Sequence, residues 1–182
     1  VVGPGGQTVV LGGGGATGIG WEAGIMQGLL DEGVDLRAAD TMIGTSAGSV
    51  VAAHARAGTD LVHGFDRIYA GEHQVPTGTF RPVDTARFIV ANLLPTGHAQ
   101  RRAILGRAAV RSARKGQVAP EEEWVAGIGE RLVGQPWPDG DLLITAVDAL
   151  TGVSVVFDKH SGVPLERAMA ASCAVPGIFP PV

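Results

Sequence analysis

Cysteine and long apolar runs are both scarce in this sequence. One of its 182 residues is a cysteine, so no disulfide forms within the chain and nothing argues for an oxidising compartment. No stretch of eighteen or more residues is apolar enough to span a bilayer, and no signal-peptide pattern with a basic start appears. Membrane-spanning and disulfide-stapled classes are therefore excluded by what the sequence lacks.

Positive charge and metal-ligand spacing are lacking as well. The net charge of −4 argues against nucleic acid as a general partner. With 45% hydrophobic and 18% charged residues, the composition is typical of one globular α/β domain. No metal or other cofactor is expected, because none of the histidines is spaced as a ligand with a cysteine or a second histidine (His54, His63, His73, His98 and His160).

The pentad Gly44-Thr45-Ser46-Ala47-Gly48 is the most informative motif. An apolar run, residues 41–43, precedes it, and a helix-forming run, residues 49–55, follows. This order predicts a strand, a sharp turn and a helix, with Ser46 pushed outward at the apex. Gly44 and Gly48 are needed because a side chain at either position would collide where strand and helix cross. Ser46 is therefore a candidate nucleophile.

A glycine-rich loop lies upstream, at residues 12–18, directly after a short predicted strand at residues 8–11. A helix follows, with Trp21, Ile25, Leu29 and Leu30 on one face and a stop at Gly33. Unpaired N–H groups at a helix N-terminus bind anions. The anion is either a nucleotide phosphate or the oxyanion that forms when a serine attacks an ester.

Residues 13–18 also fit Gly-x-Gly-x-x-Gly, and Asp40 lies about where a ribose-binding acid would be expected. Asp40, however, precedes the second strand, whereas a dinucleotide fold places that acid at a strand's carboxyl end. A phosphate loop of the Walker type is excluded, because no Gly-Lys-Ser/Thr follows the glycines. A dinucleotide-binding protein stays as a third hypothesis.

Three segments together resemble the patatin-like phospholipase family: residues 13–18, residues 44–48 and the proline-rich residues 170–181. The resemblance implies a three-layer α/β sandwich, with a central, mostly parallel sheet and helices on both faces. It also implies a Ser-Asp dyad that hydrolyses acyl lipids without a metal. Ser46 matches the nucleophile, and the N–H groups of Gly13, Gly14 and Gly15 match the oxyanion hole.

The resemblance places the general base in an Asp-Gly-Gly or Asp-Gly-Ala motif beyond the proline-rich segment, which this chain does not reach. We therefore expect a fragment of a longer protein, nearly inactive alone. Asp139-Gly140 is interpreted as a turn before a strand. The chain order also permits a triad of Ser46, Asp148 and His160, but Asp148 is more typical of a hairpin turn and His160 of a polar loop.

Basic residues gather in one segment with near-helical spacing of apolar residues, which predicts a basic amphipathic helix. Its exposed face either docks on anionic lipid or is simply solvated. The basic residues are Arg101, Arg102, Arg107, Arg111, Arg114 and Lys115.

One domain over 1–182 is expected, with the loop and elbow in 1–58, a helical cap or insertion in 60–120, and later strands with the proline-rich segment in 140–182. The predicted function is a serine hydrolase of lipid carboxylic esters, acting through an acyl-enzyme. The alternative is a non-catalytic lipid-binding or regulatory module. We expect a cytoplasmic or membrane-peripheral protein, with secretion left open.

Overall fold

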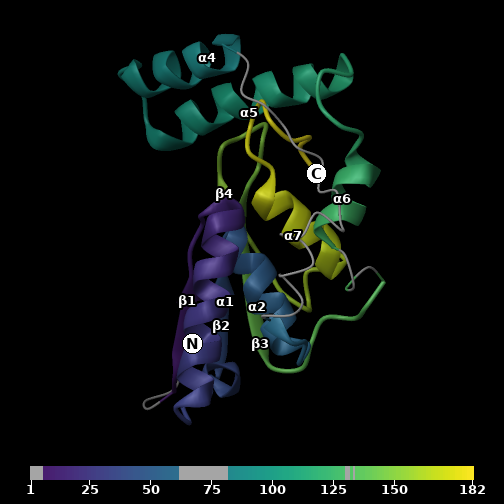
Figure 1. The fold of residues 1–182 in the computed structure, drawn as a ribbon. Coiled ribbons are helices and arrows are strands. Elements are labelled where there is room, and N and C mark those ends of the chain that lie inside the picture. Colours follow the sequence, from purple (N-terminus) through teal and green to yellow (C-terminus); the bar gives the residue numbers. More distant parts are fainter. Residues whose placement is uncertain (1–5, 62–81, 130–131, 133) are drawn as a thin grey trace.

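A four-stranded sheet organises the part of the chain that the structure, a computed structural model, describes: residues 6–61, 82–129, 132 and 134–182. Short strands alternate with helices along the sequence (Figure 1). The elements are β1 (Thr8–Leu11), α1 (Gly15–Asp31), the 3-10 helix η1 (Leu36–Ala38), β2 (Thr41–Gly44), α2 (Ala47–Arg56), α4 (Pro82–Leu93), α5 (His98–Arg114), α6 (Glu121–Ile128), β3 (Asp141–Val147), β4 (Ser154–Phe157) and α7 (Leu165–Cys173).

The strands lie in the order β1-β2-β3-β4. The first three are parallel, and β4 returns antiparallel to β3 as the predicted hairpin. Leu11 pairs with Gly44, which pairs with Ile144, so the carboxyl ends of β1 and β2 meet at one edge of the sheet. The expected α/β class, with a mostly parallel sheet flanked by helices, is confirmed.

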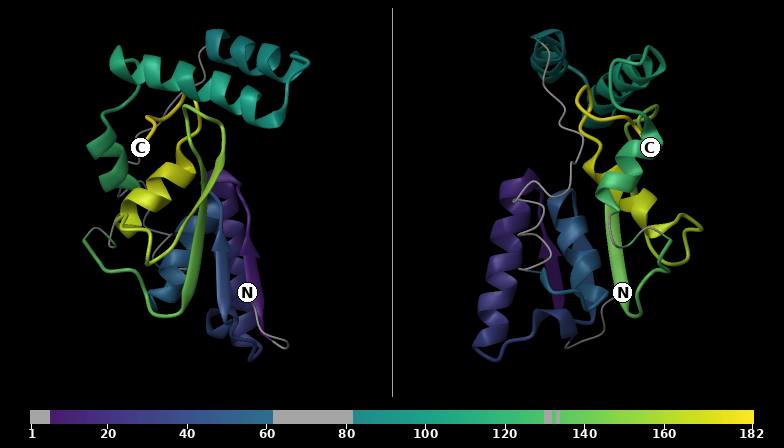
Figure 2. Two further views of the ribbon diagram at one scale, coloured as in Figure 1. Left: turned by 180° about the vertical axis from the view of Figure 1, so that it is seen from behind. Right: turned by 45° about the vertical axis from the view of Figure 1, so that its right-hand side comes forward.

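The core lies between the sheet and helices α2 and α7. Residues 47–55 of α2 are all buried, which its alanine, glycine and serine side chains permit by letting the helix pack closely on its neighbours. Met42 and Ile144 from the sheet and Met169 from α7 are fully buried there. Seen from behind, the strands stand in front of α1 and α2 (Figure 2).

The other face of the sheet carries a row of apolar side chains. Val10, Ile43 and Leu143 are aligned by the strand register, and Val156 lies on the neighbouring β4. Val10 is 68% exposed and Val156 is 55% exposed. The described residues therefore leave part of this apolar row open.

The helix predicted after the glycine loop is α1, and its apolar face is only partly covered. Trp21 is 67% exposed and Leu29 and Leu30 are half-buried, while Glu22, Ala23 and Met26 are buried. Gly18 decides the orientation: a Cβ there would lie 3.3 Å from Ala47 Cβ, so α1 approaches α2 along Gly18, Glu22 and Met26. Close backbone approach thus outweighs burial of the larger side chains.

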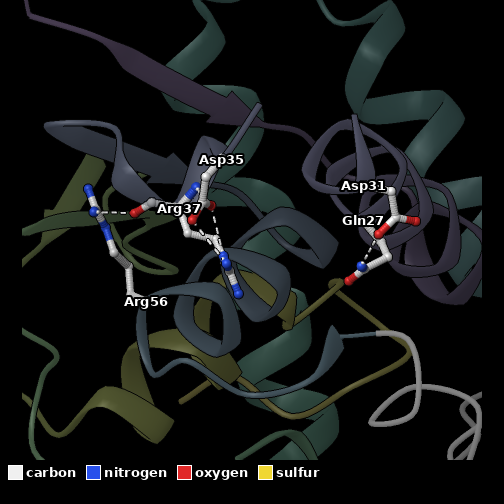
Figure 3. A network of polar contacts seen from close by, with 5 residues as sticks. All are labelled: Gln27, Asp31, Asp35, Arg37 and Arg56. Atoms are coloured by element: carbon white, nitrogen blue, oxygen red, sulfur yellow. Dashed lines mark hydrogen bonds and ion pairs between the residues drawn. The ribbon is translucent and has the colours of Figure 1, made fainter. Parts of the chain in front are cut away.

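The end of α2 opposite the elbow is fixed by the Arg56 guanidinium. It donates hydrogen bonds to the carbonyl oxygens of Arg37 at 2.9 Å and Ala39 at 2.6 Å, just before β2. Arg37 in turn pairs with Asp35, and Gln27 contacts Asp31 on α1 (Figure 3). The Arg56 contacts lie at the end of α2 that is far from Ser46, and they anchor the helix that follows it.

Helices α4 and α5 lie side by side beyond one end of the sheet (Figures 1 and 2). Helix α5 rests on the β3–β4 turn, where a Cβ on Gly106 would meet Ala149 O at 2.2 Å and one on Gly152 would meet Ala99 O at 1.8 Å. Residues 62–81, part of the expected cap, lie outside the described residues. None of the described helices has the length and apolar character needed to cross a bilayer.

Candidate active site

Ser46 stands at the apex of the turn between β2 and α2, as predicted. Its φ of 53° and ψ of −120° make it the one non-glycine residue with positive φ in the described part of the chain. Such a conformation costs on the order of 1–3 kcal/mol and persists only where the surroundings hold it. The strained backbone of Ser46 is therefore the main structural evidence for a functional site here.

The two elbow glycines are required by close backbone contacts. A Cβ on Gly44 would lie 2.5 Å from Ser49 Cα, and a Cβ on Gly48 would lie 2.3 Å from the carbonyl oxygen of Leu11. Real Cβ atoms do not approach backbone this closely. The collision expected from the sequence is therefore present at both positions.

The glycine loop lies directly against the elbow. Gly48 N–H donates to Gly12 O at 2.8 Å, and Thr45 N–H donates to Leu11 O at 3.1 Å. A Cβ on Gly13 would lie 3.5 Å from Ser46 Cβ, so the loop borders the side chain of the candidate nucleophile. The structure thus brings together the glycine loop and the serine turn, the two segments that the sequence analysis assigned to one site.

The loop also opens α1. Gly14 is the N-cap and Gly15, with φ 58°, is the first helical residue. The first N–H groups of a helix have no partner within the helix and lie at its positive end. Gly14 and Gly15 therefore lie at the positive end of α1, and Gly13, which precedes them, borders Ser46.

A buried carboxylate supports this loop from behind. Glu22 Oε1 accepts a hydrogen bond from Gly12 N–H at 2.7 Å, while Oε2 is buried and has no hydrogen-bond partner among the described residues. Burial raises the pKa of the Glu22 carboxyl above its ordinary value, and the Gly12 bond offsets this only in part. Sequence analysis did not single out Glu22, because glutamate is seldom buried and nothing in its neighbours indicates otherwise.

The end of α7 completes the surroundings of Ser46. Ser172 Oγ accepts a hydrogen bond from Ser46 N–H at 2.7 Å. Cys173 lies next to it, with Sγ 4.0 Å from Ser49 Oγ, and burial raises the pKa of its thiol to about 11. A thiol with that pKa is protonated at neutral pH, so Cys173 is no competing nucleophile. Ser172 was also missed, although it stands in the proline-rich motif that carried the resemblance.

The alternative triad of Ser46, Asp148 and His160 is not assembled. Asp148 lies before β4 and His160 after it, so they stand at opposite ends of that strand. The Asp148 carboxylate accepts hydrogen bonds from the N–H groups of Thr151 and Leu150, which hold its pKa below the ordinary value. It is a turn residue, as interpreted from the sequence.

Two other acidic residues lie at the wrong end of the sheet. Asp139 and Gly140, with φ 84°, form the turn before β3. Asp40 precedes β2 and accepts a hydrogen bond from Gln7 N–H at 2.6 Å. Because β1, β2 and β3 are parallel, both aspartates are at the edge opposite the glycine loop. Asp40 therefore does not lie at the carboxyl end of β2, where a dinucleotide site requires its acid.

A cavity of about 250 Å³ also lies away from Ser46, at the far ends of α1 and α2. It is not part of the candidate site. Its lining includes Met26, Leu30, Arg37, Thr59 and Leu61.

The predicted basic helix is α5, but its charges are not all free. Arg107 Nε donates to Leu150 O at 2.9 Å and Arg102 to Ser154 Oγ at 3.2 Å, so both help to fasten α5 to the β3–β4 turn. Arg111, Arg114 and Lys115 are exposed.

Comparison with known proteins identifies a family and finds similar solved structures. Residues 9–182 match the family described as patatin-like phospholipase. No curated protein sequence matches the chain. The crystal structure of the type III effector protein ExoU is similar, with 23% identity and a TM-score of 0.45, over 97% of this chain and 42% of that one. The chain thus spans less than half the length of that structure.

Proposed function

The chain belongs to the patatin-like phospholipase family, and from this premise we propose that the protein is a serine hydrolase that cleaves carboxylic esters of lipids through Ser46. The observation that carries the proposal is the strained Ser46 beside the glycine loop. A metal or cofactor is not required by this chemistry.

In the proposed reaction, Ser46 Oγ attacks the ester carbonyl carbon and its proton passes to a general base. The N–H groups of Gly13, Gly14 and Gly15 hold the oxyanion, and the alcohol leaves with a proton, so that an acyl-enzyme forms. Water then hydrolyses the acyl-enzyme and a fatty acid is released. Losing one such oxyanion donor costs a rate factor of about 10² to 10³.

The proposed base is an aspartate that is not among residues 1–182. The carboxylates weighed from the sequence, Asp139 and Asp148, are both turn residues. Residues 1–182 alone are therefore proposed to be nearly inactive. A non-catalytic lipid-binding module with the same fold is the second candidate, since no described carboxylate is recorded in contact with Ser46.

We further propose that α4 and α5 face an anionic membrane. Leu93 on α4 is 78% exposed, and three further apolar side chains of that helix are exposed too (Val83, Ile89 and Val90). The exposed Arg111, Arg114 and Lys115 lie on the neighbouring α5. Apolar side chains next to basic ones suit a surface of anionic lipid. The protein would then act at a membrane periphery.

The test is labelling of the complete protein with a fluorophosphonate probe, with mass mapping of the modified peptide. We expect the probe on Ser46, no labelling of Ser46→Ala, and normal labelling of Ser161→Ala, which alters an exposed turn serine. Labelling would then justify assays on lipid esters. An unlabelled complete protein would contradict the hydrolase and favour the lipid-binding module.

A further inference from the structure

Two serine hydroxyls hold the backbone on either side of the candidate nucleophile. Ser172 Oγ accepts a hydrogen bond from Ser46 N–H at 2.7 Å. Ser49 Oγ donates to Ser46 O at 2.6 Å. The two peptide groups that set φ and ψ of Ser46 are therefore each tied to a side chain.

These two contacts differ in how replaceable they are. Ser46 O also accepts from Ser49 N–H at 2.9 Å, so the carbonyl keeps a partner without the Ser49 hydroxyl. Ser46 N–H has Ser172 Oγ as its one recorded partner among the described residues. Ser172 is thus the contact on which the amino side of the strained residue depends.

The end of α7 is held rigidly enough to serve this purpose. Met169 and Ala170 are fully buried. The Trp124 indole donates to Ala170 O at 3.1 Å, and Trp124 stacks on Phe179 with ring centroids 3.9 Å apart. The oxygen that Ser46 contacts is therefore fixed by a packed helix 126 residues away in sequence.

We propose that Ser172 is a positioning residue, whose hydroxyl holds the Ser46 backbone in the conformation that presents Oγ beside the glycine loop. This inference rests on the proposed function. Occupying Ser46 N–H also keeps that donor out of the oxyanion site and leaves the role to the glycine-loop N–H groups. Ser172 itself touches no reacting atom in this role.

The experiment measures the rate of fluorophosphonate labelling at Ser46 in the complete protein and its Ser172→Ala variant. Displacing a reacting group by about 1 Å costs about 100-fold in rate, so we expect labelling to slow by about 10- to 100-fold. The matched control is Ser161→Ala, because Ser161 Oγ also accepts a backbone N–H, from Asp158 at 2.7 Å, outside the site. The control should label at the wild-type rate.

A second pair of variants separates the hydrogen bond from packing. Ser172→Thr keeps the accepting oxygen, whereas Ser172→Val has nearly the same shape without it. We expect the threonine variant to label at least ten times faster than the valine variant, with melting temperatures alike. This comparison decides the matter even if Ser172→Ala does not fold.

The outcomes are distinct. If wild type and Ser172→Ala label equally fast, or threonine and valine variants label alike, the positioning role is wrong while the hydrolase stands. If the wild-type protein does not label at all, the proposed function fails and the inference fails with it.

Discussion

Replacing Gly48 by alanine tests whether the turn around Ser46 and the glycine loop are in direct backbone contact, with no side chain between them. The new Cβ would lie 2.3 Å from Leu11 O and 2.7 Å from Gly12 O, and neither oxygen belongs to a flexible side chain. The backbone must therefore separate, and the Gly48 N–H bond to Gly12 O at 2.8 Å is strained or lost.

The magnitude follows from three terms. Overpacking costs about 1–3 kcal/mol and loss of the hydrogen bond about 1 kcal/mol. The gain in helix propensity from glycine to alanine is about 1 kcal/mol. Gly28→Ala in α1 is the matched control, because a Cβ there meets nothing within 4 Å and keeps only the gain.

The two variants should therefore differ by about 2–4 kcal/mol in the free energy of unfolding, with Gly48→Ala the less stable. For a domain of this size, 1 kcal/mol shifts the melting temperature by about 2–4 °C. Thermal unfolding followed by circular dichroism should then show a difference of about 4–16 °C. Equal melting temperatures for the two variants would refute the close contact between elbow and loop.

Three further predictions concern the support of the site and its surroundings. Because the folded-state pKa of Glu22 is raised above its ordinary 4.5, the free energy of unfolding of wild type should fall as pH rises from about 4.5 through that pKa, whereas that of Glu22→Gln should not. Urea unfolding across pH 4–8 should therefore show the stability of the variant rising relative to that of wild type, and a pH-independent difference between them would contradict this. Gly152→Ala should detach α5 from the β3–β4 turn and speed amide hydrogen exchange in α5, whereas Gly162→Ala, also at positive φ but with open space around it, should not. Reversing two exposed charges, Arg111→Glu with Arg114→Glu, should weaken sedimentation with anionic vesicles by at least tenfold at low salt; unchanged binding would remove α5 from the membrane proposal.

The sequence by itself determined those secondary-structure elements that depend on a few neighbouring residues. The apolar runs and glycines around Ser46 were sufficient to predict strand, turn and helix, because a Gly-x-Ser-x-Gly turn is set by backbone sterics within a few residues. The glycine loop, the β3–β4 hairpin and the helical nature of α5 were predicted for the same reason. The assignment of Asp148 to a turn also depended on its neighbours in sequence, and in the structure its carboxylate accepts a hydrogen bond from Thr151 N–H within that turn.

Only the tertiary structure decided which residues meet. The buried face of α1 carries Glu22 and not Trp21, because the close approach of Gly18 to Ala47 fixes the rotation of the helix. The contact of Ser172 with Ser46 joins residues 126 positions apart in the sequence. Neither hydrophobic periodicity nor turn residues can predict a contact over such a separation. Local sterics therefore allowed Ser46 to be identified from the sequence as the candidate nucleophile, whereas the side chains that hold it in place depend on packing between distant segments.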